Sequence, residues 1–168
     1  MEALKIHLNP KTPKQITMAV KTLVSYLGIK NASPQYLKYT HRNWDYSVRN
    51  CFKNCEKESE KTGEQIVYGW LIWEDRKHAF LEAEFHSVLR DSGVLRANSR
   101  LIDISPRQSI KTEKVLFIED TQRVAGRKDS KTWHSWSNLK MVSGHVLAPT
   151  QHLEIVEVNE HKHKIHLV

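Results

Sequence analysis

The feature that most constrains the fold is a pair of adjacent segments with the pattern of a β-hairpin. Residues 66–73 are rich in β-branched and aromatic side chains, and residues 79–89 alternate between apolar and polar side chains. A polar segment, residues 75–77, separates them, as expected for two antiparallel strands joined by a turn. A two-stranded hairpin is marginally stable alone, so the chain must build further structure against it.

The second strand of this hairpin separates apolar from polar side chains. Its odd-numbered positions are mostly apolar: Leu81, Ala83, Phe85 and Leu89. Alternate positions point to opposite faces of a strand, and three of the even-numbered positions are polar: Glu82, Glu84 and His86. We therefore expect His86 to face away from the apolar layer.

Helical patterns precede the hairpin. Residues 14–27 carry an apolar stripe, follow Thr12 and Pro13 and end before Gly28, so they predict a helix that faces the core. A short second helical segment is expected to open at Ser33-Pro34.

A longer helix is expected to reach about residue 62, because Gly63 is a suitable stop. Its start has two readings. Either it begins near Asp45, which places Cys51 in its middle, or Asn50 caps it, which places Cys51 in the first turn.

Shorter strands are expected after the hairpin. Residues 100–104 and 115–118 predict a third and a fourth strand, and residues 153–158 and 164–168 predict two closing strands. Residues 120–143 have weak periodicity and many polar side chains, so we expect a long loop that could close over a cleft as a lid.

These patterns predict one α+β domain over residues 1–168, with a helical part, 1–62, packed on a mostly antiparallel sheet part, 63–168. A chain of 168 residues that is 39% hydrophobic suits a single core. The sequence shows neither a secretion signal nor an apolar run of about 18 residues, so we expect a cytoplasmic protein with no membrane association. It does not indicate the oligomeric state.

The formal net charge of +7 would suit an acidic partner, including nucleic acid. The cations are scattered, however, and the densest stretch, residues 123–131, also contains Gly126 and Asp129. Nucleic acid is therefore the less favoured partner.

Three residue types needed for thiol catalysis occur in order along the chain: Cys51, His86 and Asp103. A nucleophilic thiol requires a helix N-terminus or a base that favours the thiolate, and a third group that orients the base. His86 and Asp103 lie on neighbouring predicted strands, about 4.8 Å apart, which allows a hydrogen bond. Cys55 continues an apolar helical stripe and is expected to be a core thiol.

Four short motifs carry a family resemblance. They are Cys-Phe-Lys-Asn-Cys (51–55), Tyr-Gly-Trp-Leu-Ile-Trp-Glu (68–74), Glu-Phe-His-Ser-Val (84–88) and Leu-Ile-Asp-Ile-Ser-Pro (101–106). Their order, a helix cysteine followed by a strand histidine and a strand aspartate, resembles the transglutaminase-like branch of the papain-like cysteine enzymes. The motifs also look like those of an uncharacterised bacterial and phage protein family.

The resemblance implies a papain-like fold and a cysteine-dependent hydrolase or acyl transferase that cleaves an amide, either a peptide bond or a glutamine side chain, through a thioester. Cys51 would be the nucleophile, His86 the general base and acid, and Asp103 the orienting carboxylate. A peptide or protein would be the substrate, with no cofactor. The expected pocket residues are Asn54, Trp70, Glu84, Trp133 and Trp136.

Other readings of the same residues stay open. Cys51 could be a small core residue, His86 part of a solvated strand face, and Asp103 a turn former. Cys51, Cys55 and His86 could bind zinc if Glu82, Glu84 or His41 supplied a fourth ligand. The main alternative function is a non-catalytic basic protein that binds nucleic acid or an acidic protein partner.

Overall fold

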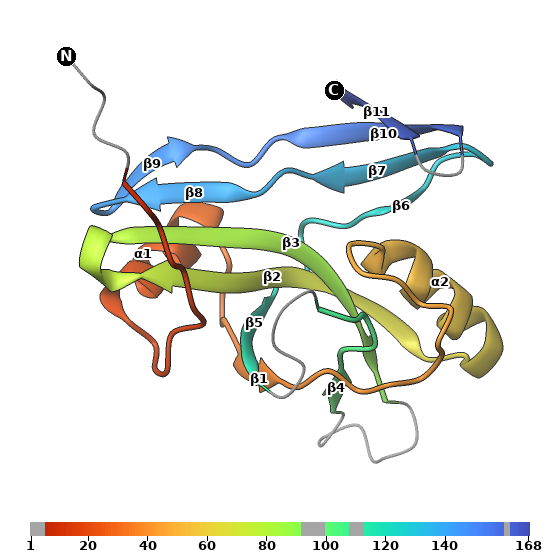
Figure 1. Ribbon diagram of the computed structural model, residues 1–168, viewed down its shortest axis with the longest axis horizontal. Coiled ribbons are helices and arrows are strands. Elements are labelled where there is room, and N and C mark those ends of the chain that lie inside the picture. The colour runs from red at the N-terminus through yellow and green to blue at the C-terminus, as the bar shows by residue number, and fades with distance from the viewer. Residues whose placement is uncertain (1–5, 92–99, 108–112, 160–161) are drawn as a thin grey trace.

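The predicted hairpin forms the centre of the fold in the computed structural model (Figure 1). The structure describes residues 6–91, 100–107, 113–159 and 162–168. The hairpin strands are β2 (Gln65–Asp75) and β3 (Phe80–Arg90), which pair along their whole length through a short 3-10 turn, η1 (Arg76–His78). Strand β2 is longer than its apolar pattern predicts, because pairing extends into the flanking polar residues, and β3 is displaced by one residue from the predicted segment.

A seven-stranded antiparallel sheet is built on this hairpin. Its strand order is β1 (Pro34–Leu37), β5 (Val115–Glu119), β2, β3, β8 (Leu139–Val142) and β9 (His145–Ala148). The short strand β4 (Leu101–Ile102) pairs with the far end of β3.

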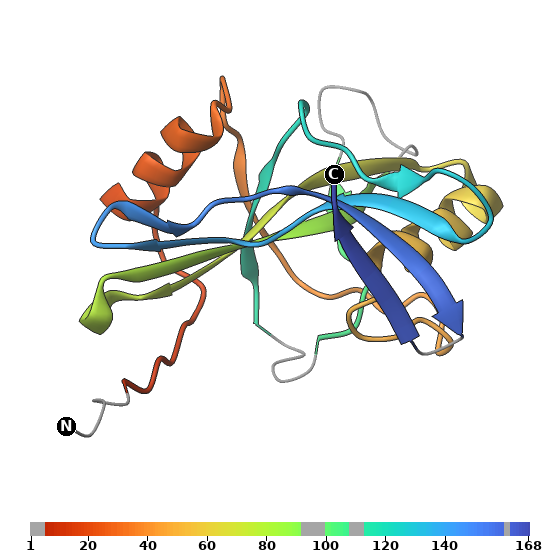
Figure 2. The same cartoon turned by 90° about the horizontal axis from the view of Figure 1, so that it is seen from above.

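A second sheet has the order β11 (Lys162–Leu167), β10 (His152–Asn159), β7 (Thr132–Trp136) and β6 (Gly126–Arg127). Strand β7 continues directly into β8, and β9 continues into β10. One long ribbon therefore belongs to the central sheet at one end and to the second sheet at the other (Figures 1 and 2).

The outer edge of β3 is interrupted between its two partners. Strand β8 pairs with β3 as far as Ala83, and β4 pairs with it only from Leu89 onward. No described strand pairs with this edge over residues 84–88. The interruption contains His86 and lies where the ribbon leaves the central sheet.

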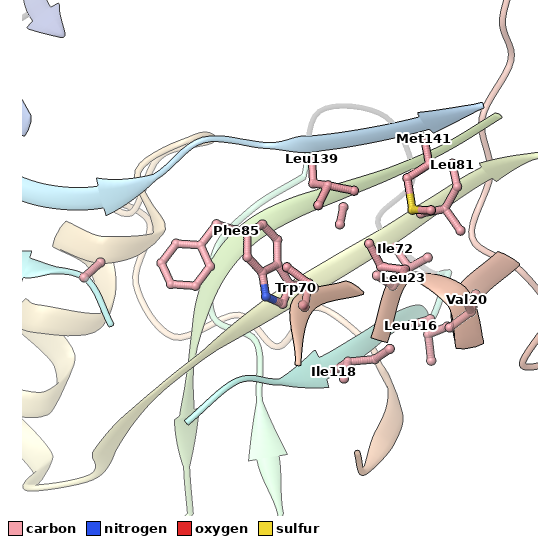
Figure 3. Packing of buried hydrophobic residues seen from close by; sticks show 13 residues of the cluster. Val20, Leu23, Trp70, Ile72, Leu81, Phe85, Leu116, Ile118, Leu139 and Met141 are labelled. Carbon is pink, nitrogen blue, oxygen red and sulfur yellow. The ribbon is translucent and has the colours of Figure 1, made fainter. Parts of the chain in front are cut away.

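Helix α1 (Met18–Leu27) covers one face of the central sheet. It begins after Thr17, whose side chain accepts a hydrogen bond from the Val20 amide, and ends at Gly28 in the left-handed conformation. Figure 3 shows the apolar cluster beneath it, which includes Val20, Leu23, Trp70, Ile72, Leu81, Phe85, Leu116, Ile118, Leu139 and Met141.

Helix α2 (Cys51–Thr62) packs near the other end of the hairpin. Asn50 is its cap position and Gly63, in the left-handed conformation, ends it. Cys55 lies in a separate buried cluster with Tyr46, Leu89, Ile102 and Ile104. The helix is therefore fixed against β3 and the segment that follows β4.

The expected α+β class is confirmed at the level of two α-helices packed with antiparallel sheets. Several element predictions are wrong. The first helix begins at Met18, because residues before Thr17 join the sheet instead. Lys11 forms a β-bridge with Glu74, and the Thr12 hydroxyl accepts a hydrogen bond from the Leu116 amide.

The predicted helical segment after Ser33 is β1, so residues 1–62 are not purely helical. Pro34 is tolerated there because it is the first residue of a strand at the sheet edge. The predicted third strand, 100–104, is shortened to Leu101–Ile102.

The predicted loop over residues 120–143 is also wrong, because this segment contains β6, β7 and β8. Leu139 and Met141 belong to the main core, so this segment is not a lid. Its sequence has weak periodicity because its short strands change from one sheet to the other. The two closing strands, β10 and β11, are confirmed.

No helix among the described residues is long and apolar enough to cross a membrane.

Gly69 is required by close packing between β2 and β5. A Cβ atom there would overlap the Ile118 carbonyl oxygen, lie 2.5 Å from Phe117 Cζ and lie 2.9 Å from Glu119 Cα. Because two of these atoms are backbone, we expect Gly69→Ala to lower the free energy of unfolding by about 3 kcal/mol or more. Gly126→Ala is the control, since nothing lies within 4 Å of its added Cβ. Urea denaturation of both variants checks this, and equal effects would contradict it.

Candidate active site

The structure brings Cys51, His86 and Asp103 together. Cys51 is the first residue of α2, His86 lies in the interrupted edge of β3, and Asp103 directly follows β4. Since β4 pairs with β3 from Leu89 onward, the chain carries Asp103 back alongside the histidine. The helix starts at Cys51, so this residue lies in the first turn as the second interpretation expected, but the Asn50 side chain makes no capping hydrogen bond.

His86 and Asp103 form a buried hydrogen-bonded pair. His86 Nε2 lies 3.1 Å from Asp103 Oδ1, and the two residues are 6% and 0% exposed. The Cys51 side chain lines the same cleft as His86 and is close enough to contribute to the raised pKa of its imidazole. This is the order of contacts that a thiol, a base and an orienting carboxylate require.

Two further groups hold the Asp103 carboxylate. The Ser105 amide donates to Oδ1 at 3.2 Å, and the Arg107 guanidinium donates to Oδ2 at 2.8 Å. Arg107 also donates to the carbonyl oxygens of Leu37 and Glu113. Both carboxylate oxygens are therefore engaged, and the orientation of the group is fixed from three directions.

The pKa values of the pair move in opposite directions. Burial opposes the charged form of His86, but the Asp103 carboxylate and Cys51 outweigh it and raise the pKa of His86 well above 6.5. Burial also opposes ionised Asp103, yet His86, Arg107 and the Ser105 amide hold its pKa below the usual value. The arrangement therefore favours an imidazolium beside a carboxylate.

The two cysteines occupy different environments. Cys51 lines a cleft at the protein surface, whereas Cys55 is fully buried, and burial raises the pKa of its thiol. Both are free thiols. Only Cys51 has the access to solvent that a nucleophile needs.

Asn54 links helix α2 to the segment that carries Asp103. It is 2% exposed, and its Nδ2 donates to the Ser47 carbonyl at 3.0 Å and to Ser105 Oγ at 3.2 Å. The amide nitrogen of Ser105 in turn donates to Asp103. Asn54 is thus a buried brace and not a residue that lines the cleft.

The cleft has a volume of about 880 Å³ and opens at the interrupted edge of β3. Its walls come from β2, β3, the first turn of α2, residues 105–107, and the ribbon where it passes between the two sheets. Aromatic and charged side chains alternate around Cys51 and His86; they include Phe52, Trp73, Glu82, Glu84, Trp136 and Lys140. Its volume is sufficient for several residues of an extended peptide.

The other expected pocket residues divide into two groups. Glu84 and Trp136 line the cleft. Trp70 is instead fully buried and donates to Asp120 at 3.0 Å, and Trp133 is buried between the Glu157 carboxylate and the Arg127 guanidinium. Trp70 belongs to the main core together with residues of α1, and Trp133 contacts Arg127 of β6 and Glu157 of β10.

Sequence reasoning missed Arg107, Ser105 and Gly69. Arg107 lies four residues after Asp103, and this short spacing was the available signal for an ion pair. Gly69 pairs directly with His86 across the hairpin, and a glycine within a strand often marks a close approach of another element.

The alternative hypotheses of a zinc site and of nucleic-acid binding gain no geometric support in the described part of the chain. No group of three or more His, Cys, Asp or Glu side chains there is arranged to hold a metal ion. In the basic stretch, Arg123, Arg127 and Lys128 pair with Asp120, Glu56 and Glu154 respectively, so these cations serve the fold.

Comparison with known proteins adds no relative: no family model, no curated protein and no solved structure matches the chain.

Removal of the Asn54 amide tests the brace between α2 and the Asp103 segment. We expect Asn54→Ala to lower the free energy of unfolding by about 1–3 kcal/mol, because two hydrogen bonds from a buried amide are lost. Lys57→Ala, on the exposed side of the same helix, should change it by less than about 0.5 kcal/mol. Urea denaturation measures both, and equal losses would contradict a bracing role.

The pH dependence of stability tests the His86–Asp103 pair. Because the folded-state pKa of His86 is raised, its contribution is complete below the unfolded pKa and is lost as pH rises through the folded value. Asp103, with a lowered pKa, stays ionised in this range. We expect the stability difference between the wild type and His86→Gln to be largest near ~pH 5.5 and to shrink toward ~pH 9.

Chemical denaturation across that range is the measurement. His145→Gln, an exposed histidine of β9, is the control and should show no such trend. A stability difference that grows with pH would contradict the prediction.

Proposed function

We propose that this protein is a cysteine-dependent hydrolase or acyl transferase that cleaves an amide through a covalent thioester at Cys51. The observation that carries the proposal is the buried His86–Asp103 pair placed beside a thiol that lines a cleft. The order of thiol, imidazole and carboxylate at the wall of a cavity supports a catalytic role.

The position of Cys51 favours its thiolate. The first backbone amides of a helix point toward its N-terminus and give that end a partial positive charge. The protonated His86 adds a full positive charge on the other side, consistent with its raised pKa. A thiolate–imidazolium pair is the reactive state of such a site.

In the first half of the reaction, the Cys51 sulfur forms a bond to the carbonyl carbon of the amide. The carbonyl oxygen becomes an oxyanion, for which the Cys51 backbone amide at the helix start is a suitable donor. The C–N bond then breaks as His86 gives its proton to the leaving amine. A thioester and a neutral imidazole remain.

In the second half, neutral His86 accepts a proton from water or an amine, which attacks the thioester and releases the thiol. Water gives a carboxylic acid and an amine gives a new amide. Asp103 keeps the imidazole oriented throughout, and its contacts with Arg107 and Ser105 hold it in place. These roles are those implied by the resemblance to transglutaminase-like enzymes, and we include that relationship in the proposal.

Thiol labelling tests the activation of Cys51. We expect iodoacetamide at ~pH 6.5 to modify Cys51 at least about tenfold faster in the wild type than in His86→Ala, because the histidine stabilises the thiolate. Cys55 is the internal control and should be labelled slowly in both proteins, since it is buried with a raised pKa. Peptide mass spectrometry reads each site separately, and similar slow labelling of both cysteines would reject the proposal.

Turnover tests the reaction itself. A library of fluorogenic peptide amides and glutamine-containing peptides should yield an acyl adduct on Cys51, detectable by intact mass after acid quenching. Cys51→Ala should abolish turnover, and His86→Ala should reduce it by about 10² or more. Cys55→Ala is the matched control and should keep turnover when it remains folded.

A further inference from the structure

Glu84 occupies a defined position in the cleft. It lies on β3 two residues before His86, and both side chains point to the same face of the strand. The Trp73 indole donates to Glu84 Oε2 at 3.1 Å, which orients the carboxylate. Glu84 is half-buried, so part of it remains open to the cleft.

Apart from His86, the other charged groups that line the cleft are Arg49, Glu82, Arg107 and Lys140. Arg107 pairs with Asp103, and Lys140 lies directly opposite Glu82 in the pairing of β3 with β8. Glu82 also accepts a hydrogen bond from Asn138, and Arg49 has a further interaction of its own. Among the described residues no cation forms an ion pair with Glu84, although five carboxylate and cationic groups line the same cavity.

The spacing relates Glu84 to the reaction centre. The Cα atoms of residues two apart on a strand are separated by about 6.6 Å, so Glu84 and His86 are neighbours on one face of β3. In an extended peptide substrate, residues two apart are separated by the same distance. A charge carried one or two residues from the cleaved amide would therefore reach Glu84.

We propose that Glu84 is a specificity-determining residue that binds a positively charged group of the substrate, an ammonium or a guanidinium, next to the cleaved amide. The inference rests on the function proposed above and names its substrate class. The half-buried carboxylate gains an ion pair from a cationic substrate, whereas an anionic substrate would meet a fixed like charge. Trp73 acts as a positioning residue, because its indole hydrogen bond orients the carboxylate.

Charged thiol reagents test this without a known substrate. Methanethiosulfonates that carry a trimethylammonium, a methyl or a sulfonate group all transfer their thiol part to a cysteine, with loss of methanesulfinate. We expect the cationic reagent to modify Cys51 faster than the anionic one. Glu84→Gln should lower the cationic-to-anionic rate ratio by about tenfold, while the neutral reagent changes less than about twofold.

The variant preserves the local structure, because a glutamine oxygen can still accept the Trp73 hydrogen bond. Glu82→Gln is the matched control, since Glu82 lies two residues farther from His86 and faces Lys140. It should change the ratio by less than about twofold. In the wild type, ~1 M salt should reduce the ratio without any mutation.

The outcomes separate this inference from the proposed function. If Glu84→Gln leaves the ratio unchanged, or if the wild type reacts faster with the anionic reagent, the role of Glu84 is rejected. If Cys51 shows the charge preference but the neutral reagent modifies the wild type no faster than His86→Ala, the catalytic proposal fails instead. Thiosulfonates report the charge near any accessible thiol, so the charge preference does not depend on catalysis.

Discussion

The buried carboxylate of Asp103 is the interaction on which the site and much of its surroundings depend. A fully buried charge is costly unless every oxygen is paired, so the fold must bring donors to it from several directions. They come from β3 through His86, from the turn after β4 through the Ser105 amide, and from Arg107. The Asp103 backbone carbonyl also accepts a hydrogen bond from the Thr40 amide. This bond connects the segment after β1 to Asp103.

The hydrogen bonds around Asp103 also connect helix α2 to the central sheet. Asn54, one helical turn after Cys51, donates to Ser105, and Ser105 donates to Asp103. Cys51 is therefore placed by the same polar network that places its base. A change in any member would shift the others, since a partly satisfied buried network is less stable than a complete one.

The hairpin and the order of the three reactive residues could be predicted from sequence because both depend on local information. Strict alternation over residues 79–89 fixed the face on which His86 lies, and Gly63 marked the end of α2. The contact between His86 and Asp103 followed from neighbouring strands. That they meet is a matter of geometry; that they catalyse a reaction stays a prediction.

The ribbon that builds the second sheet could not be predicted in this way. Its strands are short, several have exposed polar positions, and β7 and β8 follow each other while belonging to different sheets. Their stability comes from pairing with β10 and β3, which are distant in sequence. Trp70 and Trp133 were misplaced for the same reason, because the elements that cover them are set by tertiary contacts.

The interrupted edge of β3 reconciles a buried pair with an accessible thiol. Had β8 continued along β3 beyond Ala83, its backbone would have occupied the space that the cleft now fills beside residues 84–88. Because β8 ends there and the ribbon departs, the His86 imidazole keeps Asp103 on its buried side and meets Cys51 at the cavity. Together with His86, the Arg107 guanidinium lowers the pKa of Asp103 and favours its carboxylate, the form that would orient the base in the proposed reaction.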